Sequence, residues 1–108
     1  MIDQKIKERI IDVLKVVKPE KIVLFGSYVY GVPSSDSDID LLIIKNIKTT
    51  EVRNYRLNVK KLLWQEFKDD SIWFDILVDS EKRIADRIKL GDLFYEEIYS
   101  KGQVLCEG

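Results

Sequence analysis

Hydrophobic positions recur along the chain with the spacing of helices in some segments and the compact runs of strands in others. Between residues 3 and 17 the apolar side chains follow the helical period, at Ile6, Ile10, Val13, Leu14 and Val17. This helix should end at Lys18, because Pro19 disfavours helical geometry in the residue before it. A second helix is predicted over residues 50–67, with one apolar face formed by Val52, Tyr55, Val59, Leu62, Leu63 and Phe67.

Three short runs rich in β-branched and aromatic residues predict buried strands, at residues 21–25, 39–44 and 72–78. After the third run, Ser80 can cap a helix that carries Ile84 and Ile88, and Gly91-Asp92 interrupts this helix. A further helical segment over residues 92–100 and a short edge strand from Gln103 to Cys106 complete the pattern.

Helices alternate with strands in this pattern, and such alternation predicts a mixed sheet with helices packed on it. We therefore expect an α/β (α+β) fold with a small mixed β-sheet flanked by helices. The 108 residues suit one domain spanning 1–108.

The amino-acid composition excludes several kinds of catalytic site, metal site and cross-link. The chain has no histidine and one cysteine, Cys106, so it offers no serine–histidine triad, no histidine-bound zinc and no internal disulfide. Its 18 basic and 19 acidic residues balance, which argues against direct nucleic-acid binding. No apolar stretch approaches the length of a membrane span, so we expect a cytoplasmic protein without a membrane partner.

The turn after the first strand is the first candidate for chemistry. Gly26-Ser27 follows the strand abruptly and can open a short helical turn. Glycine lets a bound group approach the backbone closely, and the serine hydroxyl with the following N–H groups can hold an anion such as phosphate. An ordinary glycine turn with a capping serine explains the same two residues.

Two aspartates open the second strand. Asp38 and Asp40 are two residues apart, so the alternation of a strand sends both side chains to one face. Nothing cationic lies beside them in the sequence, and a divalent cation would relieve their repulsion, with oxygen ligands favouring Mg²⁺ or Mn²⁺. Solvated aspartates at a junction between loop and strand are the alternative.

Asp75 stands inside the third strand with three apolar residues on each side. A buried, unpaired carboxylate would cost several kcal/mol, so it needs a metal, a cation or exposure at the edge of the sheet. Together, a phosphate-type turn and three carboxylates on neighbouring strands suit two-metal phosphoryl chemistry, in which paired ions clamp the attacking and leaving oxygens.

The pattern Gly26-Ser27, ten residues, then Asp38-Ile39-Asp40 resembles the signature of the DNA polymerase β-like nucleotidyltransferase superfamily. Phe74-Asp75 and the closing Ile98 to Leu105 segment extend the resemblance over most of the chain. The small size is similar to that of minimal nucleotidyltransferase (MNT) proteins, the antitoxins of HEPN–MNT toxin–antitoxin pairs.

This resemblance implies an enzyme that moves an NMP, with ATP as co-substrate, onto a hydroxyl in the presence of Mg²⁺ (two ions) or Mn²⁺. It implies that Asp38 and Asp40 are metal ligands, that Asp75 is the third catalytic carboxylate and metal ligand, and that Gly26 and Ser27 contact the phosphates. The implied acceptor is a tyrosine of a cognate HEPN-type toxin, bound in a hetero-oligomer, because a chain of this length carries no separate substrate domain.

Two other functions stay open. The protein could neutralise its partner by occlusion without catalysis, or transfer a nucleotide to a small molecule of the antibiotic type. Many relatives place arginines after Gly-Ser, whereas here Tyr28-Val29-Tyr30 follows, without a cation. Arg53, Arg56 and Lys60 share one helix face, which either contacts the nucleotide or a partner or is simply solvated. Candidates for exposed apolar surface that would serve a partner are Trp64, Trp73, Phe94 and Tyr95.

Overall fold

A mixed four-stranded sheet forms the centre of the part of the chain that the computed structural model describes, residues 3–31 and 38–107. Its strands are β1 (Lys21–Phe25), β2 (Ile39–Ile44), β3 (Phe74–Asp79) and β4 (Gln103–Glu107), in the spatial order β3-β2-β1-β4. β1 is antiparallel to both β2 and β4, whereas β2 and β3 are parallel. The mixed sheet confirms the predicted α+β fold.

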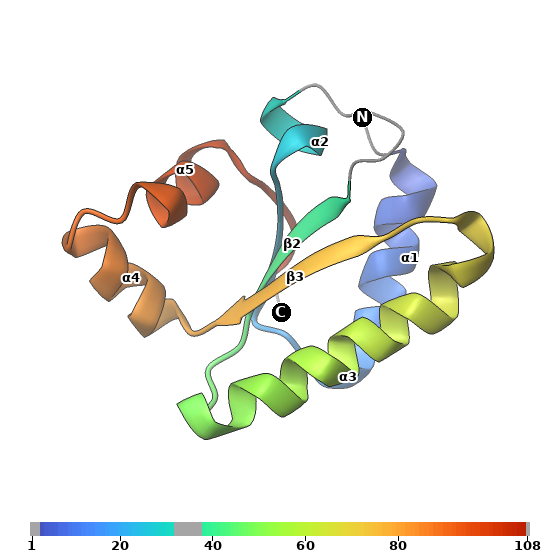
Figure 1. The fold of residues 1–108 in the computed structure, drawn as a ribbon, viewed down its shortest axis with the longest axis horizontal. Helices are drawn as coiled ribbons and strands as arrows, with labels where there is room; N and C mark the ends of the chain where they lie inside the picture. The colour runs from blue at the N-terminus through green and yellow to red at the C-terminus, as the bar shows by residue number, and fades with distance from the viewer. Residues whose placement is uncertain (1–2, 32–37, 108) are drawn as a thin grey trace.

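Helices cover both faces of this sheet (Figure 1). They are α1 (Gln4–Leu14), α2 (Ser27–Tyr30), α3 (Thr49–Phe67), α4 (Glu81–Lys89) and α5 (Leu93–Lys101), with 3₁₀ turns at Lys15–Val17 and Lys68–Asp70. None of the helices in the described part of the chain combines the length and the apolar character needed to cross a bilayer.

Two groups of buried side chains show which helices lie on which face. Ile10 and Leu14 of α1 and Val59, Leu63 and Phe67 of α3 pack against Ile39, Leu41 and Ile43 of β2. Ile84 of α4 and Tyr95 and Ile98 of α5 pack against Phe25, Leu42 and Ile44 on the other face. β2 is central, so its apolar residues are buried on both faces, and this explains its continuous hydrophobic run.

Helix boundaries follow local signals. Ser80 caps α4 as predicted, since its hydroxyl accepts the N–H of Arg83 at 3.2 Å. Asp92 caps α5 in the same way, so the break at Gly91-Asp92 is confirmed. The first helix is shorter than predicted: it ends at Leu14, continues as a 3₁₀ turn to Val17, and Lys18 before Pro19 adopts a φ of 50°.

Two further predictions need correction. The third strand begins at Phe74 rather than at residue 72, because its neighbour β2 begins at Ile39, the register partner of Phe74. Tyr95 is buried, with 9% of its surface exposed, because it packs on the α4–α5 face of the sheet. Trp64, Trp73 and Phe94 are exposed as expected.

Candidate active site

The turn at Gly26 lies beside the predicted aspartates because β1 and β2 are antiparallel. The last residue of β1, Phe25, is the register partner of Asp40, so the chain leaves β1 where β2 begins. Ser27 then starts the short helix α2, in which the N–H groups of Val29 and Tyr30 donate to the carbonyl of Gly26 at 3.0 and 3.1 Å. The predicted helical turn after Gly-Ser is therefore confirmed, and it stands next to the start of β2.

Gly26 is required here for two reasons. Its φ is +80°, a conformation that residues with a side chain rarely adopt. A Cβ atom at this position would also overlap the carboxylate of Asp40, which lies directly against the glycine backbone. The glycine of the motif thus makes room for an aspartate of the motif, a relation that sequence spacing alone does not reveal.

The three aspartates come from two neighbouring strands. Asp38 is exposed immediately before β2, and Asp40 is partly buried within it. Asp75, in β3, is the direct register partner of Asp40. The parallel pairing of β2 and β3 therefore brings together the carboxylates that the sequence places far apart.

Asp75 lies on an edge strand, since β3 is the outermost strand of the sheet. Its side chain is exposed despite the apolar residues on either side. Exposure at the sheet edge therefore accommodates this carboxylate.

The carboxylates disturb one another electrostatically. Burial, which is the largest cause, and the negative charges of Asp75 and Asp38 together raise the pKa of Asp40 to about 6. Among the described residues no lysine or arginine forms an ion pair with any of the three. The site therefore carries negative charge that the described part of the protein does not neutralise.

A second aspartate of β3, by contrast, is neutralised by its neighbours. Asp79 accepts hydrogen bonds from the hydroxyl of Tyr95 at 3.1 Å and from the N–H of Ser80 at 2.9 Å, and it pairs with Arg83. This network ties the end of β3 to α4 and α5. Sequence reasoning missed it, although Asp79 and Arg83 have the four-residue spacing of a helical ion pair.

The donor chemistry of the site fits a divalent cation. Carboxylate oxygens are the ligands that Mg²⁺ and Mn²⁺ prefer, and a cation would offset the repulsion that raises the pKa of Asp40. The side chains are not gathered into a finished site, however: within residues 3–31 and 38–107 no group of three acidic or cysteine side chains is arranged to hold a metal.

Aromatic side chains border the carboxylates on the α5 side. Phe25, the partner of Asp40, meets Phe94 of α5 edge to face, with ring centroids 5.9 Å apart. Phe94 keeps 52% of its surface exposed. Arg53, Arg56 and Lys60 lie on α3, which covers the opposite face of the sheet, so this cationic face does not line the aspartates.

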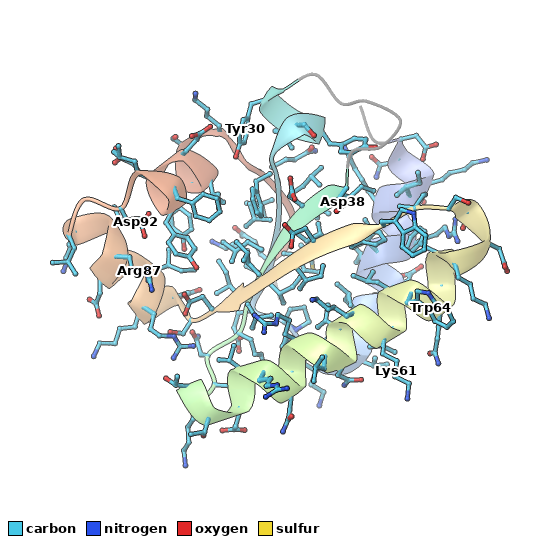
Figure 2. All side chains as sticks on the ribbon, viewed as in Figure 1. Tyr30, Asp38, Lys61, Trp64, Arg87 and Asp92 are labelled. Carbon is cyan, nitrogen blue, oxygen red and sulfur yellow. The ribbon has the colours of Figure 1, made fainter. Side chains whose placement is uncertain are left out.

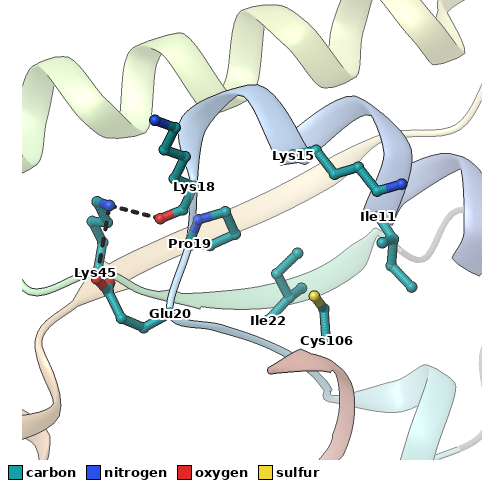
Figure 3. Close-up of a pocket in the computed structure, with 8 residues that line it drawn as sticks. All are labelled: Ile11, Lys15, Lys18, Pro19, Glu20, Ile22, Lys45 and Cys106. Atoms are coloured by element: carbon teal, nitrogen blue, oxygen red, sulfur yellow. Dashed lines mark hydrogen bonds and ion pairs between the residues drawn. The ribbon is translucent and has the colours of Figure 1, made fainter. Parts of the chain in front are cut away.

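A cavity of about 390 Å³ lies at the other end of the sheet (Figure 3). It is lined by Ile11, Lys15, Lys18, Pro19, Glu20, Ile22, Lys45 and Cys106. Lys45 donates to the carbonyl of Lys18 at 2.6 Å and pairs with Glu20, and Lys15 pairs with Asp12 outside the lining. None of the predicted site residues lines it.

Comparison with known proteins identifies a family for the chain. No curated protein matches the chain. The profile of the nucleotidyltransferase domain family matches residues 4–103, a span that contains the Gly26-Ser27 turn and the three aspartates. The chain therefore belongs to the nucleotidyltransferase domain family, and the reaction class that this membership supports is nucleotidyl transfer.

Proposed function

We propose that the protein transfers AMP from ATP onto a tyrosine hydroxyl of a partner protein, a HEPN-type toxin, and thereby acts as its antitoxin. The observation that carries this proposal is the register pairing of Asp40 with Asp75 beside the Gly26-Ser27 turn. In a member of the nucleotidyltransferase family, this pairing places two carboxylates next to a turn suited to phosphate.

The proposed reaction breaks one bond to the α-phosphorus and forms another. The acceptor oxygen bonds to the α-phosphorus, the bond from this phosphorus to the bridging oxygen breaks, and pyrophosphate leaves. Asp75 accepts the hydroxyl proton, because its exposed carboxylate can be reached by an acceptor from outside the sheet. Gly26 and Ser27 contact the phosphates.

Asp38 and Asp40, with Asp75 as a further ligand, would hold two Mg²⁺ ions, and Mn²⁺ shares the same ligand preference. When bound, these ions stabilise the negative charge on the phosphate oxygens and lower the pKa of the attacking hydroxyl. Asp40 must be ionised to serve as a ligand, and its pKa of about 6 means that half of the metal-free protein carries this charge at about pH 6.

A protein acceptor is supported by apolar surface on the α5 side of the site. Leu93 and Phe94 at the start of α5 are 74% and 52% exposed, and Leu90 before them is 88% exposed. Adjacent exposed residues of this size are typical of surfaces that another protein covers.

The test uses ATP labelled at the α-phosphate, Mg²⁺ and the protein encoded by the neighbouring open reading frame. Label should appear on that partner with the wild-type chain, and no label should appear when the γ-phosphate carries the isotope. Asp38→Ala and Asp40→Ala should abolish transfer. Asp12→Ala, a change at an exposed aspartate of α1 outside the site, serves as the matched control and should keep activity. A wild-type protein that leaves its partner unlabelled contradicts the proposal.

A second candidate is neutralisation by binding alone. Two observations favour it: the described carboxylates are not gathered into a metal site, and Tyr28-Val29-Tyr30 provides no cation for a triphosphate. Under this function, Asp38→Ala and Asp40→Ala would still bind the toxin and still protect cells that express it.

A further inference from the structure

A groove lies on the α3 side of the molecule, between the C-terminal half of α3 and the segment that leads into β3. It encloses about 210 Å³ and is lined by Lys60, Leu63, Trp64, Ile72, Trp73 and Phe74. Leu63 is buried and Phe74 is half-buried, so the floor is apolar. This volume accommodates one large apolar side chain.

Two tryptophans stand at the groove with much of their surface in contact with solvent. Trp64 is 54% exposed and Trp73 is 58% exposed. In Figure 2 the Trp64 side chain projects from α3 away from the sheet, on the same outer side as Lys61. Exposed aromatic side chains around a hollow are typical of the anchoring points of protein interfaces, where tryptophan is enriched.

The rim of the groove is positively charged. Lys60 lines it, Lys61 neighbours it on α3, and the ammonium group of Lys68 lies 5.2 Å from the centre of the Trp64 ring. No carboxylate of the described residues forms an ion pair with these three lysines.

Two acids near this end of α3 do not neutralise the lysines. Glu66 and Asp70 lie 3.6 and 2.7 Å from the guanidinium of Arg9, and Arg9 also donates to the carbonyl of Glu66 at 2.9 Å. Asp69 is the remaining exposed acid nearby. Their pairing with Arg9 leaves the charge of the three lysines available to a bound molecule.

We propose that this groove binds an acidic segment of a partner protein, with one large apolar side chain inserted between Trp64 and Trp73. The inference deepens the proposed function, on which it rests for the identity of the partner, by assigning where the acceptor protein docks. Phe74 lines the groove, and Asp75 follows it in β3 with its side chain on the opposite face of the sheet. Because β3 is the edge strand, a partner held in the groove can reach the carboxylates around this edge.

The occupant is a protein rather than a nucleic acid because the positive charge is local. The chain carries a net charge of −1, and the lysine rim is bordered by Glu66, Asp69 and Asp70. A nucleic acid requires a basic surface that follows its backbone over several phosphates, whereas a short acidic segment needs only the rim itself.

The tryptophans supply a direct assay, because Trp64 and Trp73 are the two tryptophans of the chain. Their fluorescence therefore reports on the groove alone. A short blocked peptide of glutamate and aspartate around a central phenylalanine should shift the emission to shorter wavelength in a saturable manner. The affinity should fall as salt is added, because the attraction is partly electrostatic.

Two control ligands decide between occupants. The same peptide with lysine in place of its acidic residues should cause no saturable shift. A single-stranded oligonucleotide that shifts the emission when the acidic peptide does not overturns the inference in favour of nucleic acid. Sedimentation of the chain alone tests whether the groove instead binds a second copy of the chain. If the chain forms dimers and Trp64→Ala abolishes them, the inference is overturned in favour of a second copy.

Charge-reversal variants distinguish binding at the groove from a general effect of the protein's net charge. Reversal of the rim, with Lys60, Lys61 and Lys68 changed to Glu, should weaken binding of the peptide about tenfold or more. The charge-matched control changes Lys5, Lys82 and Lys89 to Glu; these lysines are exposed on α1 and α4, and binding should stay within about twofold. Equal loss in both triple variants, with circular dichroism unchanged, overturns the inference.

Substitution of the aromatic anchors tests the apolar part. Trp64→Ala and Trp73→Ala should each weaken binding of a dye-labelled peptide at least about tenfold, as expected for interface anchors. Leu57→Ala, at a residue of α3 that is 52% exposed outside the groove, is the matched control and should have no effect. Unchanged binding in both tryptophan variants overturns the inference.

Different experimental results would refute the docking groove and the proposed reaction. Peptide binding is measured without ATP and should be unchanged by Asp38→Ala, so a protein that binds the peptide but never labels its partner refutes the reaction alone. If the partner is labelled, and the reversed lysine rim leaves the KM for that partner unchanged, the groove is refuted and the reaction stands.

Discussion

The strongest quantitative prediction concerns Asp40, whose ionised form should destabilise the folded protein. The change Asp40→Asn keeps the shape of the side chain and its fit against Gly26, while it removes the charge. In the folded protein the pKa of Asp40 rises from 3.8 to about 6, through burial and the charges of Asp75 and Asp38. Between these two pH values the folded state binds more protons than the unfolded state, so stability falls as pH rises.

The size of the effect follows from the same values. A rise of about two pH units at about 1.36 kcal/mol per unit sets an upper limit of about 3 kcal/mol. Asp40 is only partly buried, and screening by solvent reduces the expected cost to about 1–2 kcal/mol. Asp40→Asn should therefore stabilise the protein by about this amount above pH 7 and by less than about 0.5 kcal/mol at pH 4, where the wild-type carboxyl is protonated in the folded state.

Urea unfolding followed by circular dichroism, at pH 4 and pH 7.5 and without divalent ions, measures both free energies. Asp69→Asn, at an exposed aspartate outside the site, is the control and should change the free energy of unfolding by less than about 0.5 kcal/mol. The reasoning is refuted if Asp40→Asn is no more stable than the wild type at pH 7.5, or if its gain is the same at both pH values. Mg²⁺ should stabilise the wild type and not the Asn variant.

Three further outcomes are expected. Gly26→Ala should destabilise the fold by about 2 kcal/mol in thermal unfolding and abolish transfer, because its φ is +80° and the added methyl group meets Asp40. Tyr95→Phe should cost about 1 kcal/mol in urea unfolding, since it removes the hydrogen bond to Asp79, and should leave the Mg²⁺ dependence of transfer unchanged. In initial-rate measurements at saturating Mg²⁺, transfer should increase with pH and reach half of its plateau at about pH 6 or slightly below, because bound metal favours the ionised form of Asp40; a rate independent of pH from 5 to 7 contradicts this.

Much of the fold is predictable because the local signals are strong. The apolar period of α3, the cap at Ser80 and the break at Gly91 each mark an element that the structure contains. In β2, Ile39, Leu41 and Ile43 share one face, as the alternation of a strand requires. These features depend on neighbours within a few residues, which a sequence displays directly.

The rest depends on pairing between distant segments. Asp75 has the local surroundings of a buried residue, and only its position on an edge strand explains its exposure. Tyr95 is buried because α5 packs on the sheet with this residue facing inward. The position of Tyr95 in the sequence does not reveal this orientation. Likewise, the contact between Gly26 and the Asp40 carboxylate arises from the register of β1 and β2.

The strand order also has a consequence for synthesis on the ribosome. β1 lies inside the sheet, yet one of its two partners is β4, which pairs Lys21 with Glu107. The three strands that carry the Gly26-Ser27 turn and the aspartates can pair before β4 has emerged, but β1 then presents an open hydrogen-bonding edge. The nascent protein can thus bring the turn and the aspartates together before its sheet is complete. During that interval the unpaired strand edge belongs to β1, which is an internal strand of the finished sheet.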